Sequence, residues 1–317
     1  MKNFKRVLLG MDLSNTDLKL LDYLKLLSKS QHFEAVYCSH VVRAFDVPSF
    51  VLDEMGGMTA RPLDERLKKN LQDEISLKIR PNALKIQVDV LEGKLTQELL
   101  HWSEVKGIDL AIFGRKKQAS SLAARRFLRR SNCSVLFVPS SSKAKIKRIA
   151  LATDYSQTST YVLLETLKWI EQMEEKVQLE LIHVYDVPSG VRAQLGDVPE
   201  ILLNRIREAQ EKFGRYYLET LGLNPDTIQL RLVENTHINP GIHIQKAAQS
   251  SKADLLLLGA YGHSFLENLI VGSVSERILE LDSEIPLLVV RPPKEAIKQL
   301  PTFSIKNFKK IDYAEAY

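Results

Sequence analysis

The sequence predicts an α/β protein built from two tandem, open, doubly wound parallel sheets flanked by helices. Three observations lead to this fold class. The chain contains an internal duplication, its short apolar runs are continuous rather than alternating, and longer stretches with helical periodicity lie between those runs. Continuous apolar runs are typical of strands covered on both faces, as in a parallel sheet.

The duplication is visible in the strand segments and in the turns that follow them. Lys5–Ser14 matches Lys147–Ser156, and Asp109–Gly114 matches Asp254–Gly259. Shorter matches pair Ser39–Val42 with Ile182–Tyr185, Phe45–Ser49 with Tyr185–Ser189, and Val135–Val138 with Leu287–Val290. We therefore expect domains at residues 1–142 and 143–293, followed by a C-terminal tail at residues 294–317.

The second copy shows the alternation of strands and helices most clearly. Helical spacing of apolar residues predicts helices over Thr160–Met173 and Glu200–Leu221. Strands that alternate with helices form βαβ units, whose parallel sheets bind ligands beyond the carboxyl ends of the strands. The apolar runs that predict strands are Arg148–Thr153, Leu179–Val184, Leu255–Gly259 and Leu287–Val290.

The composition is that of a globular protein in a reducing compartment. The 317 residues include two cysteines, Cys38 and Cys133, which do not form a CxxC pair. No apolar run approaches the roughly 20 residues that a membrane helix needs. The apolar run Val7–Met11 is too short for a signal peptide, and Asp12 interrupts it. We therefore expect a cytoplasmic protein without membrane contact.

A candidate phosphate-binding loop follows the strand that ends at Leu258 and Gly259. Gly262 comes three residues later, and Gly272-Ser273 opens a predicted helix from Val274 to Leu281. We expect Gly259 and Gly262 to adopt positive φ and to let the backbone approach a ligand. A helix N-terminus favours phosphate, and the hydroxyls of Ser273 and Ser275 add donors.

Asp154 ends the first strand of the same copy, so it should face the same crevice as the glycine loop. A strand-end carboxylate suits ribose hydroxyls. Each glycine alone would be an ordinary turn residue, but four elements converge on one end of one sheet.

The spacing of Gly259, Gly262, Gly272 and Ser273 resembles the ATP-binding signature of the universal stress proteins. The resemblance extends to Asp154, to His183-Val184 and to the run from Ile285 to Val290. It covers almost the whole chain as two tandem units and implies five-stranded, Rossmann-like domains. It also implies ATP carried with Mg or Mn, an internal pseudo-dimer of the two domains and further homodimerisation.

The same resemblance implies which residues contact the nucleotide. Adenine would rest near Val184, the end of the first strand would meet adenine and ribose, and the glycine loop would hold the phosphates. The implied binding residues are Ala152, Thr153, Asp154, Val184, Leu258, Gly259, Gly262, His263, Gly272, Ser273, Val274 and Ser275.

The first copy departs from this pattern. It keeps Asp12 and Gly114, but Lys117 stands where the second glycine should be. A basic run replaces the loop, which predicts either a solvated helix face or a site for an anionic partner. Nucleic acid is not expected, because Phe127 is the only aromatic residue between Phe113 and Phe137. The clustered basic residues are Arg115, Lys116, Lys117, Arg125, Arg126, Arg129 and Arg130.

Other chemistry finds less support in the sequence. His237, His243 and His263 lie near the second-copy loops but lack the spacing of a zinc site, so we assign no metal ligands. No nucleophile elbow, Walker A lysine or pair of catalytic carboxylates is present, so we assign no catalytic residues.

The leading hypothesis is a cytoplasmic ATP-binding stress sensor or regulator with one nucleotide per chain. The alternatives are a slow ATP hydrolase and a nucleotide-free interaction module.

Overall fold

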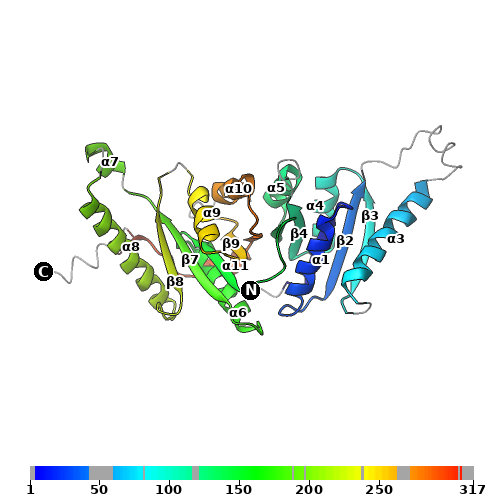
Figure 1. Cartoon of the computed structure of the whole chain (residues 1–317), viewed down its shortest axis with the longest axis horizontal. Coiled ribbons are helices and arrows are strands. Elements are labelled where there is room, and N and C mark those ends of the chain that lie inside the picture. The colour runs from blue at the N-terminus through cyan, green and yellow to red at the C-terminus, as the bar shows by residue number, and fades with distance from the viewer. Residues whose placement is uncertain are drawn as a thin grey trace. The chain divides into compact units, whose positions relative to one another are not determined.

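The computed structural model describes residues 4–42, 60–80, 83–115, 121–187, 189–195, 198–236, 239–262, 272–305 and 308. The chain divides into two units, with the main division after residue 145, and each unit is an α/β domain (Figure 1). The expected fold class is therefore confirmed.

The first unit alternates strands and helices from its first strand onward (Figure 1). Its sheet has the order β3-β2-β1-β4-β5, and the pairs β1–β2, β1–β4, β2–β3 and β4–β5 are parallel. Helices α1 and α3 contact each other, as do α4 and α5. The elements are β1 (Arg6–Met11), α1 (Thr16–Leu27), β2 (Ala35–Val42), α3 (Ala60–Lys78), β3 (Ile86–Glu92), α4 (Leu95–Val105), β4 (Leu110–Arg115), α5 (Ser121–Arg130) and β5 (Ser134–Pro139).

The second unit repeats this arrangement with the order β10-β9-β6-β7-β8. The pairs β6–β7, β6–β9 and β7–β8 are parallel. Helix α6 packs on β6 and β9, α8 packs on β8, and α9 packs on β7. The elements are β6 (Arg148–Thr153), α6 (Gln157–Glu171), β7 (Gln178–Tyr185), α7 (Ser189–Leu195), α8 (Glu200–Thr220), β8 (Gln229–Glu234), α9 (Gly241–Ser250), β9 (Leu255–Gly259), α10 (Ser273–Glu280), β10 (Leu287–Val290) and α11 (Lys294–Lys298).

Hydrogen bonds at the amino end of each first strand show the duplication at atomic level. The Asp109 carboxylate accepts hydrogen bonds from the backbone N–H groups of Lys5 and Arg6 at 3.0 and 3.1 Å. Its counterpart Asp254 accepts them from Lys147 and Arg148 at 2.9 and 3.1 Å. The two copies therefore share this side-chain contact as well as their strand order.

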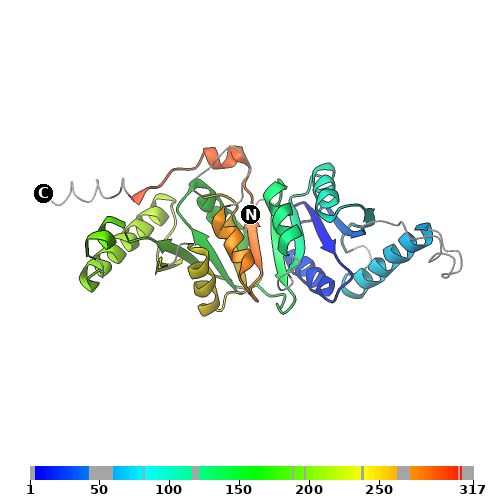
Figure 2. The same ribbon diagram turned by 90° about the horizontal axis from the view of Figure 1, so that it is seen from above.

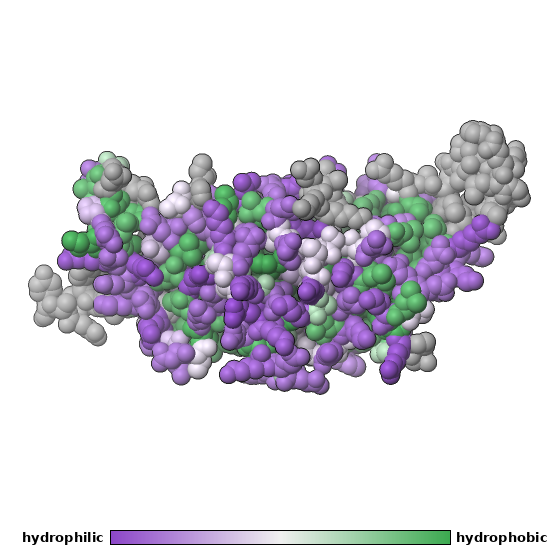
Figure 3. Space-filling view, viewed as in Figure 1, coloured by the Kyte–Doolittle hydropathy of each residue, from purple (hydrophilic) through white to green (hydrophobic). Residues whose placement is uncertain are grey.

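The long helix α8 illustrates how the apolar pattern sets burial. Phe213, Gly214, Tyr217 and Leu218 are buried, at the spacing that places residues on one face of a helix. The outer face carries mostly charged residues, which are purple in Figure 3, although Ile201 near the start of the helix is 74% exposed. Among the helices of the described residues, none is both long enough and apolar enough to cross a bilayer.

The first residues after β10 pack against the second unit. Helix α11 contacts α6, and Ile297 and Phe303 are 4% and 5% exposed. In Figure 2 this segment is red and runs along the second unit. The described start of the expected tail, residues 294–305, therefore contributes to the core of this unit.

Candidate functional site

A cavity lies at the carboxyl edge of the second sheet, where the strand order reverses between β6 and β9. From β6 the chain order runs outward through β7 and β8, whereas β9 and β10 lie on the other side. The helices that follow β6 and β9 cover opposite faces, so the strand ends separate and leave a crevice. The cavity volume is about 200 Å³.

The structure brings the sequence-predicted binding residues together around this one cavity. It is lined by Ala152, Thr153, Asp154, Val184, Leu258, Gly259, Gly262, Gly272, Ser273, Val274 and Ser275. His263 lies outside the described residues. Residues from four separate segments thus converge as expected, while their roles in binding stay a prediction.

Asp154 is fixed by hydrogen bonds within its own turn. Its Oδ1 atom accepts hydrogen bonds from the backbone N–H of Ser156 at 3.0 Å and from the Ser159 hydroxyl at 2.9 Å. Its Oδ2 atom points toward Gly262, because a Cβ atom added there would lie 2.9 Å from it. The carboxylate is therefore oriented toward the glycine loop, and Gly262 keeps the space between them open.

Helix α10 points its N-terminus into the cavity. Gly272 is its N-cap residue and donates a backbone hydrogen bond to the Ala260 carbonyl at 3.0 Å. Ser273 is exposed at the first helical position, whereas Ser275 is buried with its Oγ atom 3.5 Å from the Gly259 carbonyl oxygen. Ser273 is therefore the hydroxyl better placed to meet a ligand, beside N–H groups at the positive end of the helix.

The expected positive φ at Gly259 and Gly262 is wrong. In the described part of the chain, the glycines with positive φ are Gly93, Gly107 and Gly222. A Cβ atom at Gly259 would lie 2.5 Å from Cγ2 of Thr158, so close packing against α6 explains this glycine. At Gly272 the nearest atom to an added Cβ is 3.8 Å away, so the fold itself leaves room for a side chain there.

Ser159, Pro240, Ile244 and Tyr261 also line the cavity, although the sequence reasoning did not assign them. Asn239 joins two of the lining elements, because it accepts from the Gly241 N–H at 2.8 Å and donates to the Ser273 carbonyl at 3.3 Å. Its position beside α10 depends on how the two helices pack.

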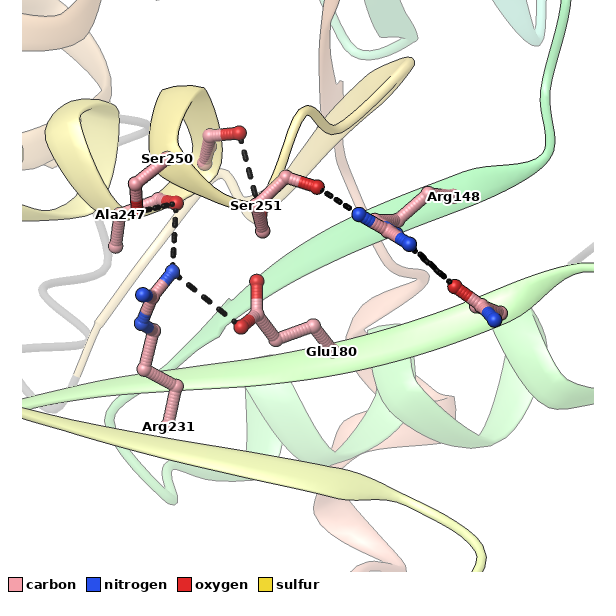
Figure 4. Close-up of polar contacts among 8 residues, drawn as sticks. Arg148, Glu180, Arg231, Ala247, Ser250 and Ser251 are labelled. Carbon is pink, nitrogen blue, oxygen red and sulfur yellow. Dashed lines mark hydrogen bonds and ion pairs between the residues drawn. The ribbon is translucent and has the colours of Figure 1, made fainter.

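The opposite end of α9 is anchored by two arginines (Figure 4). Arg231 donates to the Ala247 carbonyl at 2.9 Å and forms an ion pair with Glu180 at 3.4 Å. Arg148 donates to the Ser251 carbonyl and to the side chain of Gln178. Because cations favour a helix C-terminus, these contacts fix the helix whose N-terminus borders the cavity.

Tyr261 is held by a cation from the end of β10. Its ring centroid lies 5.1 Å from the Arg291 guanidinium carbon, and Arg291 donates a hydrogen bond to the Tyr261 hydroxyl. Arg291 is 8% exposed, so this contact lies inside the unit. The interaction orders the residue that precedes Gly262.

The corresponding edge of the first unit carries a different polar group. Asp17 occupies the position of Ser159, and its carboxylate accepts hydrogen bonds from the backbone N–H groups of Asp12 and Leu13 at 3.1 and 2.7 Å. Burial raises the pKa of Asp17 to about 6, and the charge of Asp12 adds to this effect. A second carboxylate beside the strand-end aspartate is unfavourable for a phosphate ligand.

The basic cluster of the first unit is only partly a surface feature. Arg126, Arg129 and Arg130 are exposed on α5, whereas Arg125 is half-buried. Arg115 is 9% exposed at the end of β4, and burial lowers its pKa to about 10. Lys116 and Lys117 lie outside the described residues. An anionic partner at this cluster therefore stays a prediction, with three exposed arginines as its described surface.

The histidines considered for zinc do not form a described cluster. His237 and His263 lie outside the described residues, and the Nε2 atom of His243 accepts the Thr236 backbone N–H at 3.1 Å. Within the described ranges, no three His, Cys, Asp or Glu side chains are grouped to hold a metal ion.

Comparisons with known proteins agree with this architecture. The model of the Universal stress protein family matches residues 3–139 and again residues 145–291. Universal stress protein MJ0531 of Methanocaldococcus jannaschii is 30% identical over 154 residues, which cover 47% of this chain and 84% of that protein.

Two solved structures are similar in fold along nearly their whole length. A universal stress protein from Archaeoglobus fulgidus has a TM-score of 0.60 at 19% identity, covering 92% of this chain and 97% of that one. The functionally unknown protein PA1789 from Pseudomonas aeruginosa has a TM-score of 0.58 at 15% identity, covering 97% of both chains.

Proposed function

The chain belongs to the universal stress protein family, and on this basis we propose that its second unit binds ATP and acts as a nucleotide-dependent sensor or regulator in a stress response. One observation carries the proposal. Asp154 and the N-terminus of α10 border the same cavity at the point where the strand order reverses. A carboxylate for ribose and a helix N-terminus for phosphate are the two groups that a nucleotide requires there.

The remaining walls fit the other parts of the ligand. Val184, Leu258 and Ile244 supply an apolar surface for a base, on the side of the strand ends. Ser273 supplies a hydroxyl on the phosphate side. We expect Mg²⁺ or Mn²⁺ to arrive with the phosphates, where it would neutralise their charge.

Binding is favoured over turnover by the chemistry of the cavity walls. Of the described residues that line it, Asp154 is the one carboxylate, and its Oδ1 atom already accepts two hydrogen bonds. A carboxylate held in this way positions a ligand and is poorly suited to activate water. Pairing of the two units and homodimerisation of the chain stay predictions.

The test is ATP·Mg titration by calorimetry with three glycine variants. Gly272→Glu should weaken ATP affinity at least about 100-fold, because it places a carboxylate where the phosphates would lie. Gly262→Val should also abolish binding by filling the space above Asp154. Gly190→Glu is the matched control, since nothing lies within 4 Å of an added Cβ there, and it should bind as the unmodified chain does. Unchanged affinity in both loop variants would contradict the site.

The nucleotide released by heating the purified chain separates the alternatives. Intact ATP supports a binding protein, whereas ADP or AMP supports the slow hydrolase. A chain that carries no nucleotide and shows no ATP-induced thermal shift would be an interaction module instead.

A further inference from the structure

The match to the family model ends at residue 291. The chain continues along the second unit beyond that point, and Ile297 and Phe303 there are buried. The Gln157 side chain, at the start of α6, donates a hydrogen bond to the Leu300 carbonyl at 2.6 Å. The ring of Phe303 then packs edge-on against Tyr217 of α8, with centroids 4.7 Å apart. We call residues 294–305 the C-terminal strap (Figure 2).

Tyr217 is one wall of an aromatic box that encloses Tyr155. The Tyr155 ring lies 4.3 Å from the His183 ring, 4.8 Å from Tyr217 and 5.1 Å from Phe213, measured between centroids. Tyr155 is 3% exposed and Tyr217 is fully buried. Phe303 therefore contacts the outside of a wall whose inner side contacts Tyr155.

Tyr155 immediately follows Asp154 and has a left-handed backbone, with φ of 61°. A left-handed conformation is unfavourable for a residue other than glycine, because its Cβ atom comes too close to the following carbonyl oxygen. The surrounding packing must hold such a residue in place. In the second unit the aromatic box supplies this packing, so the box sets the backbone direction next to the Asp154 carboxylate.

Hydrogen bonds connect the same elements on a second route. The Tyr217 hydroxyl donates to Thr160 Oγ1 at 3.0 Å, and the Thr160 backbone N–H donates to the carbonyl of Ser156 at 2.9 Å. The Ser156 backbone N–H in turn donates to the Asp154 carboxylate. Thr153 accepts the backbone N–H of Tyr155 at 3.0 Å and bonds to Ser159, which donates to Asp154. A shift of Tyr217 would therefore reach Asp154 through both the ring packing and the hydroxyl groups.

We propose that Phe303 is a positioning residue for the nucleotide site: the strap completes the aromatic box, and the box holds the Tyr155 turn so that Asp154 faces the ribose. This inference rests on the proposed ATP site. It makes a segment outside the family-matched residues part of the binding mechanism of this chain.

The first experiment measures ATP·Mg affinity of full-length variants by calorimetry. Phe303→Ala should weaken binding about 5-fold or more, the range typical of energetic coupling between sites. Phe303→Leu, which keeps most of the volume, should restore most of the affinity. Ile297→Ala is the matched control, because Ile297 is buried to the same extent in the strap but outside the box, and its affinity should be unchanged.

The second experiment uses the unmodified chain and does not depend on the stability of any variant. Because coupling between sites is reciprocal, ATP·Mg should slow amide hydrogen exchange in residues 294–305. Unchanged exchange there, or equal ATP affinity of Phe303→Ala and the unmodified chain, would overturn the positioning role while leaving the ATP site intact. A chain that binds no ATP would overturn both proposals.

Discussion

Leu13 and Tyr155 adopt the same left-handed backbone conformation, with φ angles of 59° and 61°, one residue after the strand-end aspartate of each unit. The two copies stabilise this turn by different means. Leu13 is 42% exposed, and its turn is held by the buried Asp17 carboxylate, whereas Tyr155 is buried in an aromatic box. The duplicated backbone was kept while its supports diverged, which makes each support separately testable.

Removing the Tyr155 hydroxyl should leave the protein as stable as before or stabilise it by up to about 1 kcal/mol. Among the described residues this buried oxygen has no hydrogen-bond partner, and a buried polar group without a partner is costly. Tyr217→Phe is the control, because the Tyr217 hydroxyl bonds to Thr160 at 3.0 Å and its loss should cost about 1 kcal/mol. Urea denaturation of both variants measures the difference, and equal losses would contradict the expectation.

Asp17 should make the stability of the first unit depend on pH between about 4 and 6. Its pKa is about 6 in the fold against 3.8 for the free side chain. The folded chain therefore holds more protons than the unfolded chain in this window, so the free energy of unfolding falls as pH rises through it. The protonated Asp17 carboxyl therefore stabilises the folded chain fully below the unfolded pKa of 3.8, and this stabilisation is lost above the folded pKa of about 6.

The measurement compares the unmodified chain with Asp17→Asn over pH 4–7. The difference in unfolding free energy between them should change by about 1–3 kcal/mol, after allowance for solvent screening, in the direction that disfavours the unmodified chain at higher pH. A difference that stays constant over this range would show that Asp17 is not the titrating group.

Arg231 should be essential to the stability of the second unit because of Glu180. The Glu180 side chain is 3% exposed and pairs with Arg231 at 3.4 Å. Arg231→Met removes the partner of a buried charge and should cost about 3 kcal/mol. Adding Glu180→Gln to this variant should recover part of the loss, which a double-mutant cycle in urea would measure. If Arg231→Met lowers the free energy of unfolding by less than about 0.5 kcal/mol, the pair contributes no more than an exposed surface ion pair does.

Gly114 and Gly259 should both tolerate alanine poorly, for a reason unrelated to ligands. An added Cβ would lie 2.7 Å from Thr16 Cγ2 in the first unit and 2.5 Å from Thr158 Cγ2 in the second. We expect each Gly→Ala variant to lose about 1–3 kcal/mol by overpacking. Thr16→Ser and Thr158→Ser remove the clashing methyl groups and should restore stability in the double variants. If they do not, the glycines are required for another reason.

The repeat and the continuous apolar runs predict the fold class and, within a few residues, the bounds of the second-unit elements to which the sequence analysis assigned ranges. Helices expected at Thr160–Met173 and Glu200–Leu221 are observed at Gln157–Glu171 and Glu200–Thr220. These features are local. A strand buried on both faces requires a continuous run of apolar residues, and a helix buried on one face requires apolar residues at helical spacing. The carboxyl ends of parallel strands share one edge, so the converging site residues could be predicted as well.

Other features depend on packing between segments that are distant in sequence. The sequence indicated glycines in the loop, but only the neighbouring helix shows that Gly259 makes room for Thr158, while Gly272 has space around it. Likewise, the sequence predicts only a tail at residues 294–305, because no local pattern indicates that Phe303 packs against Tyr217. Periodicity specifies which face of an element is buried, whereas the identity of the partner on that face is decided by the three-dimensional fit of whole elements.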